Sequence, residues 1–172
     1  MALDKIIVTN AGHALLAKTP QGVGAHVTRW QFGTGALPPQ TALESVTELL
    51  EPLKFLPIAS VANDGAQATV MGQFVNTDMD AFVWEELGLW ASDPDEGEIL
   101  FAYGNARGAG DLIDAGNVKL REFTFGVQVC FSSAAEVTFE SQKSLIFATL
   151  KDLEDVAAKV RGFYQTFEAE DW

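Results

Sequence analysis

Cysteine and the basic residues are both scarce in this chain of 172 residues. The single cysteine, Cys130, lies in an apolar run, so no framework of disulfide bonds can form and stability must come from burial or from association of subunits. Against 24 acidic residues stand 11 basic ones, which leaves a net charge of −13. That charge repels DNA, RNA and anionic lipid surfaces, so nucleic acid is not an expected partner.

Histidines and long apolar runs are scarce as well. The two histidines, His13 and His26, have no second histidine or cysteine at metal-ligand spacing, so no metal site is predicted. No G-x-S-x-G motif marks a hydrolase nucleophile, and no cofactor is predicted. Met1–Val8 is too short for a secretory signal, and no apolar run approaches the length of about 18 residues that spans a membrane. These absences predict a soluble protein made in the cytoplasm, with no membrane insertion.

Apolar sequence, in contrast, is plentiful. Apolar residues make up 48% of the chain. Folding a chain of this length should hide about 70% of its unfolded surface, which is enough for a real core. We therefore expect one domain, with or without a short appendage.

A first helix is predicted close to the N-terminus. Thr9 or Asn10 can cap it, and its apolar positions, which include Leu15 and Leu16, recur at spacings of three to four residues. The following segment, Val27–Phe32, alternates between residue types and carries two aromatic side chains, as a strand does.

A second helix is predicted in the next apolar segment. Its apolar positions Leu43, Val46, Leu49 and Leu50 share one face at helical spacing, and Pro52 closes it. The neighbouring prolines upstream cannot be helical, so this helix must begin after them.

The middle of the chain is predicted to form antiparallel β-hairpins. Asn63-Asp64-Gly65 is a strong hairpin signal between two apolar runs, and the turn residues Asp93–Gly97 join a second pair of strands. Pro57 should keep its strand at an edge or a bulge. The predicted strands are Leu53–Val61 with Gln67–Val75, Phe82–Trp90 with Glu98–Tyr103, and the alternating segment Val118–Phe131 with Val137 and Phe139 after it.

The C-terminal segment has apolar residues at steps of four and three, which is the spacing of a heptad seam. The seam is short and Gly162 weakens it, so a helix packed on its own sheet and a bundle with copies of the chain both fit. The seam residues are Ile146, Leu150, Leu153, Ala157, Val160, Tyr164 and Phe167. The predicted fold class is therefore α+β: mainly antiparallel sheet with two short helices, followed by a C-terminal helix able to form a short coiled coil.

The adjacent glutamates Glu85 and Glu86 were weighed as a general acid and base. Neighbours on a strand point to opposite faces, so the two carboxylates cannot flank one bond. One of them is expected to face solvent and the other to meet a buried partner. An enzyme that uses this pair ranks last among the possible functions, and no catalytic residue is predicted.

Two other segments have part of a ligand-binding pattern. Asn76, Asp78 and Asp80 have the spacing of a calcium loop, but Leu87 stands where its glutamate is required. The glycine-rich stretch Tyr103–Asp111 lacks the Gly-Lys-Ser/Thr ending of a phosphate loop and is interpreted as a connecting loop.

Three tryptophans, Trp30, Trp84 and Trp90, offer aromatic faces of the kind that stack on sugar rings. In a β-rich domain such residues more often belong to the core. A carbohydrate- or peptide-binding β-rich module is therefore the alternative function that the sequence leaves open.

Four blocks of sequence carry a resemblance to a known family. The first has the form T-x-x-G-x-x-x-L-A, the second is a strand that ends in Gly-Thr-Gly, the third ends in E-L-G-L before a tryptophan, and the fourth has the form L-x-A-x-x-N. The blocks are Ile6–Ala17, Val27–Gly35, Phe82–Trp90 and Leu100–Asn105. Over residues 4–150 the chain resembles the N-terminal domain of tail fibre proteins (tail-collar fibre family) of contractile-tailed bacteriophages and related bacteriocins. It departs from the family at Ala81 and Glu85, where glycine and a basic residue are common.

The resemblance implies a virion structural protein without enzymatic activity. Such a chain would be the base or adaptor of a tail fibre that attaches to the baseplate and carries distal host-binding parts. The implied organisation is a baseplate-attachment domain at 1–142, a helical oligomerisation segment at 143–167 and an acidic tail at 168–172. The implied partners are copies of the chain in a homotrimer, a baseplate protein, and a distal fibre or receptor-binding protein. Its place would be the virion tail, assembled in the host cytoplasm, with the first helix and its Leu15 and Leu16 docking on the baseplate.

Overall fold

Antiparallel strands make up most of the structure, a computed structural model that describes residues 3, 5–18, 25–63 and 67–130. The elements in chain order are β1 (Ile7–Val8), α1 (Asn10–Lys18), β2 (His26–Gly33), the 3-10 turn η2 (Leu43–Ser45), β3 (Pro52–Leu56), β4 (Ile58–Asn63), β5 (Gln67–Val75), β6 (Phe82–Trp84), β7 (Glu86–Asp93), β8 (Gly97–Asn105), β9 (Asp111–Ile113) and β10 (Glu122–Cys130).

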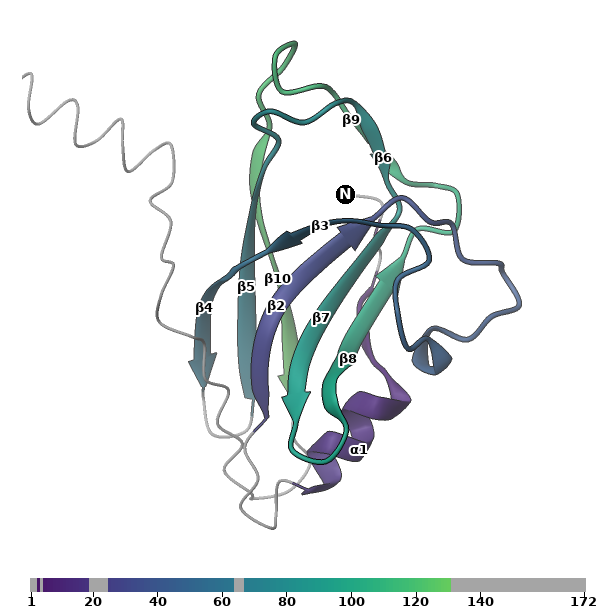
Figure 1. The fold of residues 1–172 in the computed structure, drawn as a ribbon, viewed down its shortest axis with the longest axis vertical. Coiled ribbons are helices and arrows are strands. Elements are labelled where there is room, and N and C mark those ends of the chain that lie inside the picture. Colours follow the sequence, from purple (N-terminus) through teal and green to yellow (C-terminus); the bar gives the residue numbers. More distant parts are fainter. Residues whose placement is uncertain (1–2, 4, 19–24, 64–66, 131–172) are drawn as a thin grey trace, which may run out of the picture.

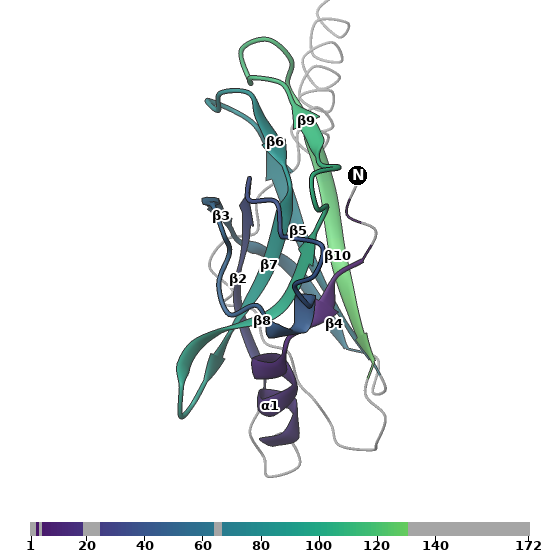
Figure 2. The same cartoon turned by 90° about the vertical axis from the view of Figure 1, so that its right-hand side faces the viewer.

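The strands form two facing sheets and a ribbon. One sheet has five strands in the order β1-β8-β7-β2-β3, and the other has three in the order β10-β5-β4. Strands β6 and β9 form a two-stranded ribbon at the end of the molecule opposite to α1 (Figure 1). Seen from the side, β2, β7 and β8 lie in one layer and β5 and β10 in the other (Figure 2).

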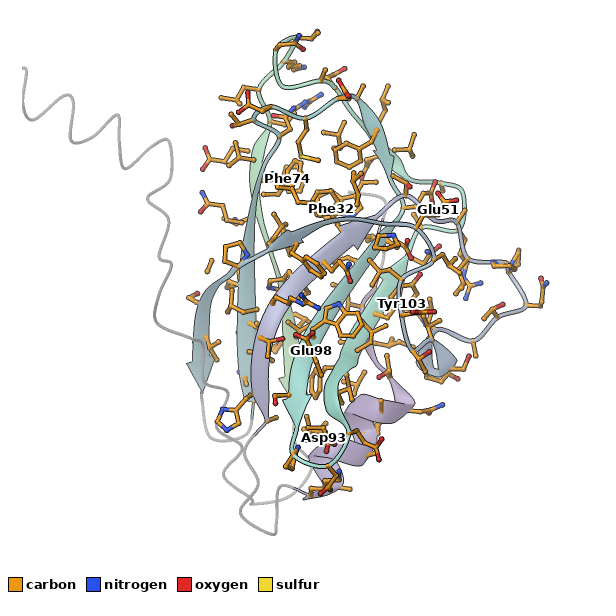
Figure 3. All side chains as sticks on the ribbon, viewed as in Figure 1. Phe32, Glu51, Phe74, Asp93, Glu98 and Tyr103 are labelled. Atoms are coloured by element: carbon orange, nitrogen blue, oxygen red, sulfur yellow. The ribbon has the colours of Figure 1, made fainter. Side chains whose placement is uncertain are left out.

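Aromatic side chains fill the space between the two sheets. Phe32 of β2 packs against Phe74 of β5 with ring centroids 5.1 Å apart, and both side chains are fully buried (Figure 3). Trp84 stacks on Phe123 of β10 at 5.0 Å. In β5 every second residue is buried, which is the period expected of a strand with one face on a core. This aromatic cluster joins the two sheets to the ribbon.

The outer face of the five-stranded sheet is partly covered by the segment 36–50. This segment has little regular structure, yet its apolar side chains form a second buried cluster with residues of β8. The buried members of this cluster are Leu37, Leu43, Val46, Leu49, Leu100 and Tyr103.

The predicted fold class is wrong in its helices. The described residues contain one α-helix, α1, and one 3-10 turn, and the rest of their regular structure is antiparallel sheet. The second predicted helix is replaced by η2, whose flanking residues Ala42 and Val46 have extended backbone angles and which has no side-chain cap. Further along, the amides of Leu50 and Glu51 donate to the Glu86 carboxylate, so tertiary hydrogen bonds replace helical ones.

The predicted C-terminal helix, with the whole of 143–167, lies outside the described residues. In the part of the chain that the structure covers, no helix has the length and apolar character needed to cross a membrane.

Within the described residues the predicted strands are found, but two of them are broken and the segment predicted from Val118 is strand only over Glu122–Cys130. Val137 and Phe139 lie outside the described residues. Pro57 divides the first run into β3, at the edge of the five-stranded sheet, and β4, at the edge of the other sheet, as the edge position of a proline requires. Glu85 divides Phe82–Trp90 into β6 and β7. Both predicted hairpins are confirmed, because β4 pairs with β5 and β7 pairs with β8 in antiparallel register.

The first helix is confirmed, and both of its ends are fixed to the five-stranded sheet. At its start the Thr9 hydroxyl accepts a hydrogen bond from Gly12 N at 3.0 Å and donates to the carbonyl of Leu100. At its end the Lys18 ammonium lies 2.7 Å from Asp93 Oδ1 and 2.8 Å from Asp95 Oδ2, in the turn between β7 and β8.

The aromatic cluster should dominate the stability of the domain. Phe74→Ala removes a fully buried ring and should lower the free energy of unfolding by about 3 to 5 kcal/mol. Phe55→Ala makes the same chemical change at a side chain that is 48% exposed, and should cost about 1 kcal/mol or less. Urea unfolding followed by circular dichroism measures both. Equal losses in the two variants would contradict the assignment of the core.

The ion pair at the end of α1 should make stability depend on pH at both extremes. The hydrogen bond from Lys18 lowers the pKa of Asp93 below its ordinary 3.8, so this stabilisation is complete above 3.8 and is lost as the pH falls through the lowered value. Hydrogen bonds to Asp93 and Asp95 raise the pKa of Lys18 above 10.5, so its contribution is lost as the pH rises through the raised value. Urea unfolding of Lys18→Met should therefore vary less with pH at both ends. A wild-type pH profile in this variant would refute the linkage.

Candidate functional site

Glu85 and Glu86 are both buried, at 6% and 0% exposure. The prediction that one of them faces solvent is therefore wrong. Glu85 lies in the break between β6 and β7, outside regular strand pairing, so the alternation of a continuous strand does not apply to the pair. Each carboxylate instead accepts hydrogen bonds from a different segment. The Glu86 carboxylate bonds to the segment between β2 and β3, and the Glu85 carboxylate bonds to the loop between β8 and β9.

The Glu86 carboxylate accepts four hydrogen bonds. Its Oε1 receives the amides of Gly35 at 3.2 Å and Glu51 at 2.8 Å. Its Oε2 receives the amide of Leu50 at 3.0 Å and the hydroxyl of Tyr103 at 2.7 Å. A Cβ on Gly35 would lie 2.8 Å from Oε1, so only glycine leaves room for this approach. These four donors stabilise a carboxylate that burial alone would destabilise.

Tyr103 and Asn105 extend this network along β8. The Tyr103 hydroxyl accepts from Asn105 Nδ2 at 2.9 Å, and the same amide nitrogen donates to the Gly35 carbonyl at 2.8 Å. Asn105 Oδ1 accepts from the amides of Leu37 and Arg107. Burial, together with the neighbouring Glu86 carboxylate, raises the pKa of Tyr103, so its hydroxyl keeps the proton that it donates.

Glu85 holds the loop between β8 and β9 in the same manner. Its carboxylate accepts from the amides of Gly108 at 2.9 Å and Gly110 at 3.1 Å. Its main chain donates to Gly33 O and accepts from the amide of Ala106. The glycine-rich stretch is therefore a connecting loop, as predicted, and the amides of Gly108 and Gly110 are directed at a carboxylate of the protein itself.

Arg107 joins the two loops. Its guanidinium donates to the carbonyls of Pro38 at 2.7 Å and Thr41 at 2.8 Å. Glu85 fixes the loop between β8 and β9. Through Arg107 this loop is bonded to the segment 36–50, whose position Glu86 also fixes. We call the set Glu85, Glu86, Tyr103, Asn105 and Arg107 the loop clamp.

The geometry of the loop clamp suits it to fixing backbone and not to proton transfer. The oxygens of both glutamates are occupied by hydrogen-bond donors of the protein. Sequence reasoning singled out the two glutamates but overlooked Tyr103 and Asn105. The available signal was two polar residues at alternate positions in the buried stretch of β8 that begins at Leu100.

The three tryptophans do not form a platform. Trp30 and Trp84 are 0% and 2% exposed and belong to the core between the sheets. Trp90 is half-buried on the outer face, where its Nε1 donates to Gln31 Oε1 at 2.9 Å. Two of the three predicted stacking faces are thus covered by the protein itself.

Among the three residues with calcium-loop spacing, Asn76 has a structural role. The buried Asn76 side chain donates to the carbonyls of Asp114 and Lys119 and accepts from the amide of Arg121, which ties together the two loops beyond the ribbon. Asp78 and Asp80 line an open cleft of about 390 Å³ beside these loops. Within the described ranges, no group of three His, Cys, Asp or Glu side chains is placed to hold a metal ion.

The structure describes the residues that were predicted to dock on the baseplate but not those that were predicted to join copies of the chain. Leu15 is fully buried in the main core and Leu16 is half-buried against it, so the apolar face of α1 packs on the protein's own sheet. The predicted association residues, from Ile146 to Phe167, lie outside the described residues.

Comparisons of the chain with protein-family models, with curated proteins and with solved structures found no match. The resemblance to tail-collar fibre proteins therefore stays a prediction that rests on the four sequence blocks.

Removing the charge at the centre of the loop clamp should loosen the segment above it. Glu86→Gln replaces one carboxylate oxygen by an amide NH₂, so some of the four donors around residue 86 lose their acceptor. The substitution should lower the free energy of unfolding by about 3 kcal/mol. Hydrogen exchange at the amides of Gly35, Leu50 and Glu51 should quicken. Glu96→Gln makes the same change at an exposed turn position and should leave both measurements unchanged. Wild-type exchange at these three amides in Glu86→Gln would refute the clamp.

Proposed function

We propose that the chain is a structural component of a phage tail or related contractile injection particle. In this role it is the base or adaptor of a tail fibre, attaches to the baseplate and carries distal host-binding parts. The observation that supports the proposal is that the four sequence blocks on which the resemblance rests meet in one structural unit.

The first and fourth blocks meet at the start of α1. Thr9 caps the helix and bonds to main-chain carbonyls of β8, and a Cβ on Gly12 would collide with the carbonyl of Phe101. The spacing T-x-x-G is thus what lets the helix lie directly on the strand.

The second, third and fourth blocks meet at the loop clamp. Gly35 closes the second block, Glu86 is the glutamate of the third, and Asn105 is the asparagine of the fourth. All three take part in one hydrogen-bond network. Residues from three separate sequence blocks therefore depend on one another through hydrogen bonds. This dependence supports the proposal that the blocks reflect one fold, shared with the family that they resemble.

The clamped loops suit a mechanical role. A domain that passes load from a baseplate to a fibre must keep its surface loops in place, and these loops are held by buried hydrogen bonds to charged groups, which are among the stronger ones. The apolar spacing of residues 146–167 supports association of three copies, which would give the fibre its axis.

Sugar or peptide binding is the second candidate function. An open cleft of about 380 Å³ between the ribbon and β10 is lined by Phe123, Arg121 and Asp111, among others, and by a small part of Trp84, whose ring is otherwise buried. Aromatic and charged groups in one cleft are typical of such sites. This module would act without a particle, so the particle experiment below distinguishes the two functions.

Particles purified from a producing culture should contain the chain, and the free chain should have three times the monomer mass by light scattering. Leu150→Asp with Leu153→Asp places charges on the apolar spacing and should yield monomers. Thr149→Asp with Ala158→Asp adds the same charge between the seam positions and should leave the trimer intact. Absence of the chain from the particles would refute the proposed function, and trimers in the first variant would refute association through these residues.

A further inference from the structure

A patch of large side chains on the outer face of the five-stranded sheet is left open beside the covering segment 36–50. We call Arg29, Leu53, Phe55 and Trp90 the β3 patch. Leu53 and Phe55 are 46% and 48% exposed on edge strand β3, with a register shift in the β2–β3 pairing at Leu53. Phe55 is opposite Gln31, Gln31 bonds to Trp90, and Arg29 lies against the rings of Phe55 and Trp90. Arg29, Phe55 and Trp90 therefore lie on the same side of the sheet, and Leu53 is two residues from Phe55 along β3.

Arg29 holds the centre of the patch in place. Its guanidinium carbon lies 3.6 Å from the centroid of the Phe55 ring and 5.5 Å from that of Trp90. Its Nη2 donates to Glu98 Oε2 at 2.6 Å. Because these contacts order the side chains before any partner arrives, the patch loses little conformational entropy on binding. Tryptophan, arginine and other aromatic residues are also enriched where binding energy concentrates in interfaces.

Acidic side chains flank the patch at both ends. Glu98 bonds to Arg29, and Glu51 immediately precedes β3, whose first residue pairs with Gly33. Arg29 and Gly33 are four residues apart on β2, so the backbone positions beside which Glu98 and Glu51 lie are about 13 Å apart along the sheet. Figure 3 shows Glu51 and Glu98 at different heights of this face. The whole chain also carries a net charge of −13.

We propose that the β3 patch is the docking face for the particle protein that holds this chain, and that this partner offers an apolar segment flanked by lysine or arginine. The proposal rests on the proposed function and names the surface and the chemistry of its attachment. Apolar side chains of the partner cover Leu53 and Phe55, and its cations lie against Glu51 and Glu98.

The charges favour this occupant over the others. A second copy of the chain would bring the same negative charge, and with it the same flanking carboxylates, to the patch. Anionic lipid and nucleic acid are repelled for the same reason. The alternative docking face on α1 offers less exposed apolar surface to a partner, because Leu15 is buried and Leu16 packs on the core.

The test uses particles purified from a culture in which the gene for this chain is deleted, mixed with the full-length chain and sedimented. Leu53→Glu with Phe55→Glu should reduce the bound chain about ten-fold or more. Leu53→Ala with Phe55→Ala, a milder change at half-exposed sites, should reduce it in the same direction, and circular dichroism establishes that each variant is folded. The matched control is Leu112→Glu, at a leucine that is 64% exposed on β9, and it should bind like the wild type.

Salt and charge test the chemistry of the partner. Binding of the wild type should weaken several-fold as ionic strength rises, because rim charges are screened. Glu51→Gln should weaken binding at low salt and flatten this dependence, and it leaves the pair of Arg29 and Glu98 at the centre of the patch intact.

Each contrary result has a separate meaning. If the wild type does not sediment with the particles, the proposed function and the docking face both fall. If it does, and the Leu53 and Phe55 variants bind equally well, only the docking face falls. Binding that changes neither with salt nor with the substitution of Glu51 would contradict a basic partner. A change in the mass of the free chain in the Leu53 and Phe55 variants would assign the patch to a second copy and overturn the proposal.

Discussion

The buried carboxylate of Glu86 is the constraint on which the outer half of this structure depends. Removing a carboxylate from water is costly unless its oxygens are hydrogen-bonded, and here three backbone amides and one phenol supply the bonds. Two of those amides belong to the segment that was expected to be a helix. The hydrogen bonds to the Glu86 carboxylate therefore fix the backbone path of residues 34–51. That path in turn sets the position of the second apolar cluster.

That path divides the outer face of the five-stranded sheet into two regions. On the β8 side the sheet is covered, because Leu43, Val46 and Leu49 lie over Leu100 and Tyr103. On the β3 side it stays open, and the aromatic and arginine side chains there are ordered by contacts with one another. The clamp that fixes the loops and the exposed patch that is already ordered are thus two consequences of one backbone path.

Sequence periodicity predicted burial better than it predicted helix. Leu43, Val46 and Leu49 were correctly expected to face a core, but Leu50, predicted on the same face, is 48% exposed. The same spacing also fits an irregular segment that covers a sheet, and the pattern alone does not separate this from a helix. The strands and hairpins were predictable because turn residues and alternation are local signals. The loop clamp was not, because its partners come from three distant segments, and only the buried position of Glu86 reveals that they meet.

The contact of Thr9 with Leu100 spans 91 positions of the chain. Helix α1 thus has no strand to pack on until β8 has been synthesised and paired with β7. Closing so long a loop is slow compared with forming the neighbouring hairpins, so the seating of α1 belongs to the late stages of folding. A nascent chain interrupted before residue 105 would leave Leu15 exposed, so the segment of α1 would need protection during translation.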